Sequence, residues 1–337
     1  LRRPSHTIAA MDPASRQPPL LIIVGPTAGG KTALSIALAN ALPGAGAGAG
    51  GGECLCADSM QVYRGMDIGT AKPTAAERAR APHHLLDLVD PSEEGFTVDR
   101  WLDVAEATIA DIRARGRFPI VVGGTNLYIK ALLEGMMDGP EPDAAMRAEL
   151  ERTPLEDLRA ELERIDPEAA SRIHPNDRKR TLRAMEPLSA QQQQWDRGTI
   201  RDDARIIGLD YPVDLINRRI NARVKAMVEA GLVEEVRALH EANALGRQAR
   251  EALGYKQLID HFEGRSTLEE AIEQIKIHTR RYAKQQRTWL RRFRGIRGWP
   301  KSLWLDAEAL STAEQVERIL HFLREAGELP PLESSPT

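Results

Sequence analysis

The sequence of 337 residues has little cysteine, few aromatic residues and no long apolar run. Its two cysteines, Cys54 and Cys56, are too few for a disulfide framework or a zinc knuckle, and their spacing is typical of small core side chains on one face of a strand. No apolar run reaches the ~18 residues that a membrane-spanning helix needs, so we expect no membrane partner and a cytoplasmic protein. The aromatic content of 4% argues against a stacking platform for generic single-stranded nucleic acid.

The sequence also lacks a large excess of charge of either sign, because its net charge is only −3. This value gives no general attraction to nucleic acid, so any such binding has to come from local basic patches. Three segments have compositions typical of flexible chain: residues 1–18, which lack the apolar core of a signal peptide, the Gly/Ala run 44–52, and the tail 326–337. We expect a disordered leader, a surface loop and a disordered tail there.

The chain is organised around the stretch 20–42, LLIIVGPTAGGKTALSIALANAL. It begins with an apolar run, 20–24, that predicts a buried strand, and ends in an Ala/Leu-rich segment with helical spacing. The turn between them fits the P-loop pattern G-x-x-x-x-G-K-[ST]. In such a loop, backbone N–H groups and the helix N-terminus hold phosphate oxygens, the lysine adds a charge and the last hydroxyl binds Mg²⁺. The residues are Gly25, Pro26, Thr27, Ala28, Gly29, Gly30, Lys31 and Thr32.

The P-loop alone does not say whether phosphorus is attacked. Enzymes that hydrolyse nucleotides or transfer phosphoryl groups commonly carry a Walker-B carboxylate after a neighbouring strand, but the predicted strand 118–122 is followed by Gly123. This absence counts against an ATPase motor or a GTPase switch, and less against a small-molecule kinase. A carboxylate, Asp58, does follow the other predicted strand, 53–57. Asp58 could cap the next segment or serve a site, and the neighbouring P-loop favours the site.

Strand-like runs are absent between 136 and 204, where the pattern predicts short helices. These are expected at 144–151, 155–164 and 167–173, with a basic helix near 174–183. We therefore predict an α/β fold with a P-loop NTPase-like core, in which helices flank a parallel sheet, plus a small all-helical insertion domain. The core would comprise 19–135 and 205–325 and include the C-terminal helices, and the insertion would be 136–204.

A concentrated basic patch lies between 276 and 297. On a helix, one face would be a buried seam made of Ile272, Ile275, Thr279, Tyr282, Gln286, Trp289 and Phe293. Another face would carry the cations Arg280, Lys284, Arg287, Arg291 and Arg294. Because such a stripe repels itself if left bare, a phosphate backbone is its natural counterion, and we expect nucleic acid to bind here.

Together these residues resemble one family, the tRNA dimethylallyltransferases (tRNA isopentenyl transferases). The matching stretches run in family order from about residue 20 to 310: GPTAGGKT, DSMQVYRGMDIGTAKP, PHHLLDLVDP, VGGTNLYIKALLEG, RIHPNDRKRTLRAME, RRINARVKAMVEAGLVEEV, ALGYKQ and TRRYAKQQRTWLRR. The resemblance implies transfer of the dimethylallyl group of dimethylallyl diphosphate to N6 of adenosine 37, in tRNAs that read codons starting with U. Pyrophosphate would leave. Chemistry at carbon explains a P-loop without a Walker-B carboxylate, since the loop would stabilise a leaving group.

The resemblance also assigns residue roles. Asp58 matches the catalytic acidic residue that takes the proton of the exocyclic amine, and Thr27 and Arg223 match residues that hold the diphosphate near its bridging oxygen, with Lys31 and Mg²⁺ on Thr32. The adenine would flip out of the tRNA anticodon stem-loop, over which the insertion would close. The family's tRNA-contacting stretches match Asp58, Ser59, Met60, Gln61, Thr125, Arg147, Lys179, Arg180, Thr181, Leu182, Arg183, Glu251, Gly254, Tyr255, Lys256, Lys284, Gln285, Gln286, Arg287, Thr288, Trp289, Leu290 and Arg291. We expect a monomer.

The chain departs from the family pattern at three places. The Gly/Ala run is longer than usual, Pro187-Leu188-Ser189 follows Glu186 at once as if several residues were deleted, and Glu251 stands where a basic or polar residue would suit RNA better. Two other classes stay open from the residues themselves. One is a P-loop nucleoside or metabolite kinase, and the other is a non-catalytic RNA-binding protein.

Overall fold

The computed structural model describes residues 17–44, 50–135, 144–185, 201–295 and 301–331. The chain forms two compact units, which are described one at a time. The larger comprises Leu1–Leu133 and Arg201–Thr337, and the smaller comprises Glu134–Ile200. Residues 1–16 of the expected leader, residues 45–49 of the Gly/Ala run and the apparent deletion after Glu186 lie outside the described residues.

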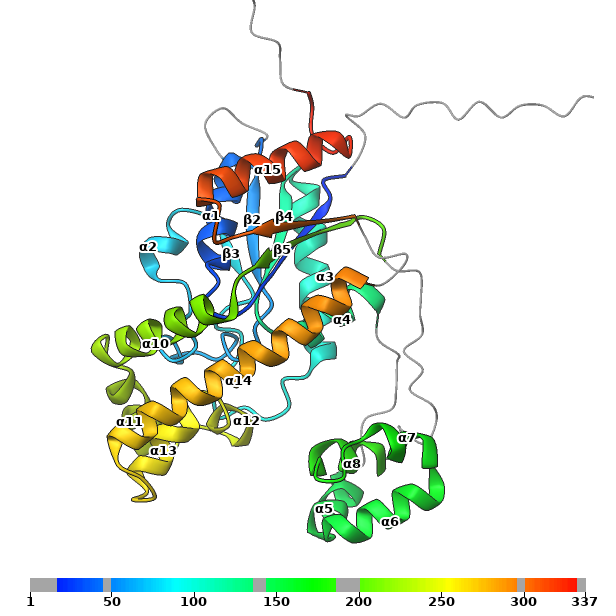
Figure 1. Ribbon diagram of the computed structural model, residues 1–337, viewed down its shortest axis with the longest axis vertical. Coiled ribbons are helices and arrows are strands. Elements are labelled where there is room, and N and C mark those ends of the chain that lie inside the picture. The colour runs from blue at the N-terminus through cyan, green and yellow to red at the C-terminus, as the bar shows by residue number, and fades with distance from the viewer. Residues whose placement is uncertain (1–16, 45–49, 136–143, 186–200, 296–300, 332–337) are drawn as a thin grey trace, which may run out of the picture. The chain divides into compact units, whose positions relative to one another are not determined.

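A six-stranded parallel sheet forms the centre of the larger unit, which confirms the predicted α/β fold (Figure 1). The strand order β3-β2-β4-β1-β5-β6 puts the strand before the P-loop in the interior of the sheet. That position explains its continuous apolar sequence, because helices cover both faces of a parallel sheet. The strands are β1 Leu20–Val24, β2 Gly52–Cys56, β3 His83–His84, β4 Phe118–Val122, β5 Ala204–Asp210 and β6 Ser302–Asp306.

The side chains of β1 alternate between two apolar clusters, one on each face of the sheet. Leu20, Ile22 and Val24 belong to the larger cluster, whereas Leu21 and Ile23 belong to the smaller one. Helices α1 and α15 complete the smaller cluster and the other long helices of this unit complete the larger one (Figure 1). The helices are α1 Lys31–Ala41, α2 Ala75–Arg78, α3 Val98–Ala114, α4 Asn126–Glu134, α10 Val213–Glu229, α11 Leu232–Glu241, α12 Arg247–Arg250, α13 Tyr255–Phe262, α14 Leu268–Gly295 and α15 Thr312–Glu325.

The long basic helix α14 forms as predicted, but its buried face is rotated slightly from the expected one. Ile275, Gln286 and Phe293 are buried as expected. Ala271, Ala283 and Leu290 are also buried, whereas four residues predicted for the buried seam are only half-buried: Ile272, Thr279, Tyr282 and Trp289. The reason is that α14 packs against both α10 and α13, so the contact face is wider than one seam.

The smaller unit contains only helices among its described residues: α5 Ala144–Arg152, α6 Leu155–Ile165, α7 Pro167–Arg172 and α8 Arg178–Met185. All four helices predicted in this stretch are present. Leu158, Leu162 and Ala170 are its most buried apolar residues. The Arg178 guanidinium donates to Thr153 O at 2.6 Å and so ties the start of α8 to the turn before α6.

Two of the segments expected to be flexible are partly ordered. The tail does not become disordered at 326, because Glu328 forms an ion pair with Arg205 and Leu329 is buried in the smaller cluster. Residues 332–337 lie outside the described residues. At the end of the Gly/Ala run, Gly52 is the first residue of β2, where any Cβ would lie 2.6 Å from Ala39 Cα of α1. Glycine there lets strand and helix approach closely.

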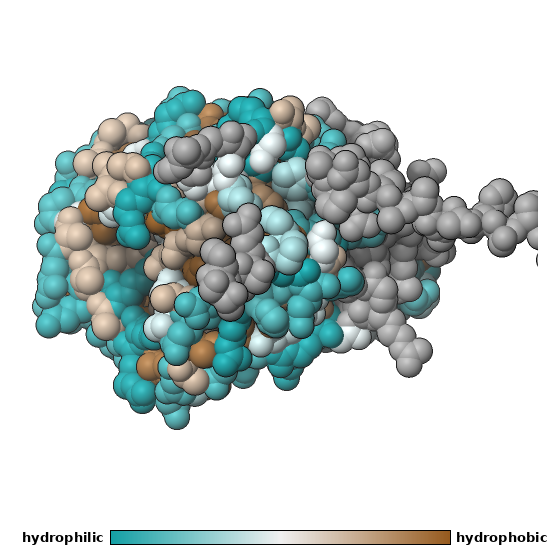
Figure 2. All heavy atoms as spheres, turned by 90° about the horizontal axis from the view of Figure 1, so that it is seen from above, coloured by the Kyte–Doolittle hydropathy of each residue, from teal (hydrophilic) through white to brown (hydrophobic). Residues whose placement is uncertain are grey.

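Hydrophilic residues cover most of the face of the molecule seen in Figure 2, and apolar residues appear there in small groups. Within the described ranges, no helix combines the length and the apolar composition needed to cross a bilayer.

Candidate functional site

The P-loop turn leaves the N–H groups at the start of α1 without a side-chain partner. Gly30 precedes α1 with φ of 77°, in the left-handed region that favours glycine. No side chain caps the start of α1, and its first turn contains no acidic residue. The N–H groups of the first turn of α1 and the positive end of its helix dipole are therefore not satisfied by a capping side chain, as an anion site requires.

Lys31 lies in the first turn of α1 and bends back over the loop. Its Nζ donates to Gly25 O at 3.0 Å and Pro26 O at 2.9 Å. Burial, together with the positive charge of Arg223, lowers the pKa of Lys31 to about 8, and Asp58 opposes this shift. An anion placed beside Nζ would favour the charged form and raise this pKa.

Two side chains that are distant in the sequence contact the P-loop, and neither contact was predicted from the sequence. Gln286 of α14 accepts from Thr27 N at 2.8 Å and donates to Gly124 O at 3.0 Å. Tyr211, just after β5, donates its hydroxyl to Gly29 O at 3.0 Å. The polar residues in the predicted buried seam of α14 were the available signal, because a buried amide needs partners.

Asp58 follows β2 and sits at the carboxyl end of the sheet. Its Oδ1 accepts from Met60 N at 2.9 Å, the usual turn made by an aspartate with the backbone two residues later. Burial raises the pKa of Asp58, while the amides of Met60 and Gln61 and the charges of Lys31 and Arg223 oppose the rise. The carboxylate is thus a stronger base than a free aspartate and stands next to the P-loop lysine.

The position that would carry a Walker-B carboxylate is closed by backbone. Gly123 follows β4, and a Cβ there would lie 2.1 Å from Ala57 O. The approach is fixed by hydrogen bonds from Ala57 N to Val122 O and from Thr125 N to Ala57 O, at 2.9 and 3.0 Å. A side chain at 123 is therefore excluded on steric grounds.

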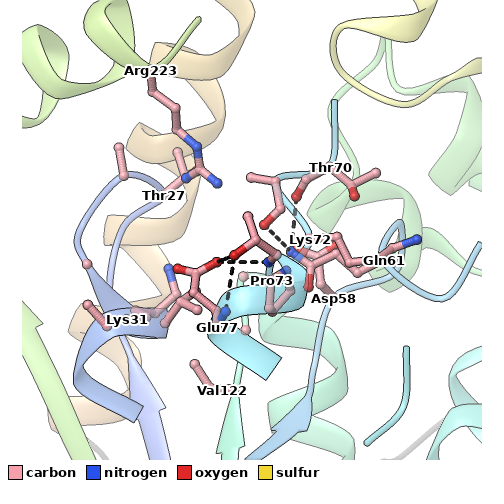
Figure 3. A pocket seen from close by; sticks show the side chains of 18 of the residues that line it. Thr27, Lys31, Asp58, Gln61, Thr70, Lys72, Pro73, Glu77, Val122 and Arg223 are labelled. Atoms are coloured by element: carbon pink, nitrogen blue, oxygen red, sulfur yellow. Dashed lines mark hydrogen bonds between the residues drawn. The ribbon is translucent and has the colours of Figure 1, made fainter. Parts of the chain in front are cut away.

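Arg223 projects from α10 toward the P-loop beside Thr27 (Figure 3). Its guanidinium pairs with no carboxylate among the described residues, although Asp58 is near enough to influence it. Burial lowers the pKa of Arg223, and Asp58 partly offsets this effect. Lys31 and Arg223 thus place two cations beside the half-buried Asp58 carboxylate.

These residues border two adjoining cavities of about 1180 and 250 Å³. The larger is lined by the P-loop, and the smaller is lined partly by apolar side chains from α10, α11 and α14. Seven residues line both: Thr27, Asp58, Thr70, Ala71, Arg223, Met227 and Tyr282. The carboxylate and the arginine therefore stand where the two cavities meet.

The loop 66–73 forms a wall of both cavities and is held from two sides. Buried Lys72 donates to Asp67 and Asp87, each at 2.6 Å. From the other side, the Glu235 carboxylate accepts three successive backbone N–H groups, those of Asp67, Ile68 and Gly69, at 2.8 to 3.1 Å. The Tyr255 hydroxyl also donates to Glu235. No sequence motif pointed to this anchoring, since its partners are far apart in the chain.

The model of the IPP transferase family matches residues 61–293, more than half of the chain. The chain belongs to the IPP transferase family. The tRNA dimethylallyltransferase of Anaeromyxobacter dehalogenans (strain 2CP-C) is 46% identical over 314 residues, which cover 89% of this chain and 99% of that relative. That of Geobacillus thermodenitrificans is 43% identical over 326 residues, covering 92% and 97%.

Solved structures agree with this assignment to the IPP transferase family. The tRNA isopentenylpyrophosphate transferase of Bacillus halodurans matches with a TM-score of 0.68 and 40% identity, over 93% of this chain and 97% of that one. A eukaryotic dimethylallyltransferase, described in crystallographic snapshots as acting on tRNA, matches with a TM-score of 0.74 and 28% identity, over 94% and 81%.

The residues expected to contact tRNA fall into two groups in this IPP transferase. Thr181, Tyr255, Gln286 and Leu290 are at most 5% exposed, so their side chains support a surface and do not form it. Gln61 is also engaged internally, since it donates to Thr70 O and accepts from the Cys56 thiol. The remaining side chains are exposed or half-buried, apart from Gly254, which lines the smaller cavity. Those on α5 and α8 belong to the smaller unit, Arg147 and Lys179 among them.

The protein atoms near the P-loop suit a metal ion that is bound mainly through a ligand. Thr32 lines the larger cavity, and its hydroxyl makes no hydrogen bond to any described residue. Among those residues, no group of three or more His, Cys, Asp or Glu side chains could hold a metal ion. This donor set fits Mg²⁺, which is commonly bound by one or two protein oxygens plus phosphate oxygens and water.

Proposed function

We propose that this member of the IPP transferase family transfers the dimethylallyl group of dimethylallyl diphosphate to N6 of adenosine 37 of tRNA. The supporting observation is the junction of the two cavities at Thr27, Asp58 and Arg223. A diphosphate on the P-loop would enter from one cavity and a flipped base from the other, so the allylic carbon would meet the amine at that junction.

The P-loop residues act on the leaving group. As the allylic C–O bond breaks, negative charge gathers on the diphosphate, and the loop amides, Lys31 and Arg223 oppose that charge. Mg²⁺ held by Thr32 and the phosphate oxygens would supply further neutralisation of the same charge. No phosphorus–oxygen bond breaks, so a Walker-B carboxylate is not required.

Asp58 serves the incoming nucleophile. As the N6–carbon bond forms, the amine loses a proton, and the Asp58 carboxylate accepts it. Its raised pKa makes it a better proton acceptor, while Lys31 and Arg223 keep it ionised before the reaction. We also infer that tRNA is met in the cytoplasm, that the protein acts as a monomer, and that the exposed cations of α14 and of the smaller unit hold the RNA backbone.

The test is transfer of label from radioactive dimethylallyl diphosphate to an unmodified tRNA that has adenosines at positions 36 to 38. With Mg²⁺, the wild-type protein should label the RNA, and nucleoside digestion should place the label on adenosine 37. Transfer from γ-labelled ATP to a nucleoside without labelling of tRNA would instead identify a kinase, which the family membership does not favour.

Asp58→Asn tests the proton acceptor with little change in shape. We expect a fall of about 10²- to 10⁴-fold in turnover, because a neutral amide cannot take the proton. Binding of pyrophosphate and tRNA should stay within about threefold of wild type, or improve for pyrophosphate as a negative charge is removed. Full activity in this variant would refute the role of Asp58.

A further inference from the structure

A second arginine, Arg219, lines the P-loop cavity beside Arg223. Arg219 lies four residues before Arg223 on α10, so the two side chains leave the same face of the helix. Both line the cavity of about 1180 Å³ that also contains the P-loop. The cavity thus receives two guanidinium groups from successive turns of one helix.

Arg219 is held beside the P-loop by an aromatic ring. Its guanidinium carbon lies 4.7 Å from the centroid of the Tyr211 ring, within the range of a cation–π contact. The hydroxyl of the same tyrosine donates to Gly29 O, and its ring edge would lie 3.3 Å from a Cβ on Gly29. A chain of direct contacts therefore fixes Arg219 next to the phosphate-binding turn.

The charge of Arg219 is not neutralised within the protein. Among the described residues, no carboxylate forms an ion pair with Arg219, in contrast to Lys225 and Arg294, which pair with Glu229 and Asp210. No described residue accepts a hydrogen bond from the Arg219 guanidinium, so its N–H edge is available. That edge matches two oxygens of a phosphate group.

The surroundings point to an anion with more than one negative charge. Elsewhere in the cavity, Lys72 pairs with Asp67 and Arg78 pairs with Asp87, so these cations are already matched. At the P-loop end, Lys31, Arg219 and Arg223 face two lining carboxylates, Asp58 and Glu77, and the start of α1 adds N–H groups that no side chain caps. The excess positive charge is suited to a diphosphate.

We propose that Arg219 binds the donor's diphosphate directly, at the phosphate distal to the transferred carbon, over Gly29 and Gly30. This inference rests on the proposed function for the identity of the donor, and on the geometry above for the anion itself. Arg223, next to Thr27, would then face the other phosphate, the one whose oxygen is bonded to the transferred carbon. Each arginine would thus bind one of the two phosphates of the leaving group.

The test compares Arg219→Gln with Arg218→Gln. Arg218 is the exposed neighbour on α10, does not line either cavity, and its replacement changes the net charge equally. Calorimetry with inorganic pyrophosphate and Mg²⁺ should show affinity about tenfold to a hundredfold weaker for Arg219→Gln and unchanged for Arg218→Gln. The KM for dimethylallyl diphosphate should rise in parallel, and Arg219→Lys should recover part of the affinity.

Three further measurements make the result decisive. Thermal unfolding without anion should give the same midpoint for both glutamine variants, which shows that the fold is intact. Pyrophosphate binding by Arg219→Gln equal to wild type would overturn the inference. A loss of tRNA affinity with unchanged pyrophosphate affinity would also overturn it, and would assign the guanidinium to RNA. If wild type binds pyrophosphate but does not prenylate tRNA, the proposed function fails while the Arg219 comparison still decides the anion contact.

Discussion

Replacement of Gln286 by alanine separates two roles for this side chain. The family resemblance places Gln286 among tRNA-contacting residues, whereas in the structure it is 1% exposed and bridges Thr27 N and Gly124 O. Gln286→Ala removes both hydrogen bonds and leaves the Thr27 N–H of the P-loop without its partner. Gly124 O keeps its bond from the Tyr282 hydroxyl at 2.7 Å.

The magnitude follows from these contacts. Two hydrogen bonds at about 1 kcal/mol each, with part of the penalty for a buried unpaired N–H, amount to a loss of about 2 to 4 kcal/mol in the free energy of unfolding. Gln285 is the matched control, because it is exposed on the same turn of α14. Gln285→Ala should change the free energy of unfolding by no more than about 0.5 kcal/mol.

Urea unfolding of the two variants, with tRNA affinity measured in parallel, decides between the roles. We expect Gln286→Ala to lower the urea midpoint and the turnover, while its tRNA affinity stays close to that of Gln285→Ala. The opposite pattern, an unchanged midpoint with weaker tRNA binding, would mean that Gln286 reaches the RNA and that the bridge to the P-loop contributes little.

Three further predictions follow from the same contacts. Because the pKa of Lys31 is about 8 in the folded protein, pyrophosphate affinity should fall as pH rises through 8. Without anion, the folded protein loses this proton near pH 8, whereas the unfolded chain holds it up to about pH 10.5. The contribution of Lys31 to the free energy of unfolding should therefore increase between those two pH values. Glu235→Gln should accelerate hydrogen exchange at the amides of 67–69 and reduce turnover, unlike exposed Glu234→Gln, and equal exchange in both would refute the anchoring. Gly123→Ala should lower the free energy of unfolding by about 1 to 3 kcal/mol, measured by urea, whereas Gly295→Ala, which meets no atom within 4 Å, should not.

The sequence predicted the elements that local pattern determines. The apolar run 20–24, the glycine-rich turn and the following helix were expected where they occur, and so was β4, because strand, P-loop and helix each have a strong local signal. The edge strands β3 and β6 were missed. One has two residues and the other is largely half-exposed, so neither has the continuous apolar sequence of an interior strand.

The parts of the site that depend on distant contacts could not be read from the sequence. Gln286 and Thr27 are 259 residues apart, and Glu235 and Ile68 are 167 apart. The apolar spacing along α14 predicts a buried face for Gln286 but does not indicate which residue Gln286 contacts. The four-residue spacing of Arg219 and Arg223 is typical of one helix face, yet only the fold shows that this face lines the P-loop cavity.

The closed position at Gly123 and the surplus of cations at the P-loop have a common consequence. A carboxylate at 123 would collide with Ala57 O, and it would also add negative charge beside Asp58, which already lines the cavity. Two carboxylates there would compete with a diphosphate for Lys31 and Arg223 and would raise each other's pKa. A P-loop that stabilises a departing diphosphate works best with its cations free and one carboxylate kept for the proton. The glycine therefore serves the electrostatics of the site as well as its packing.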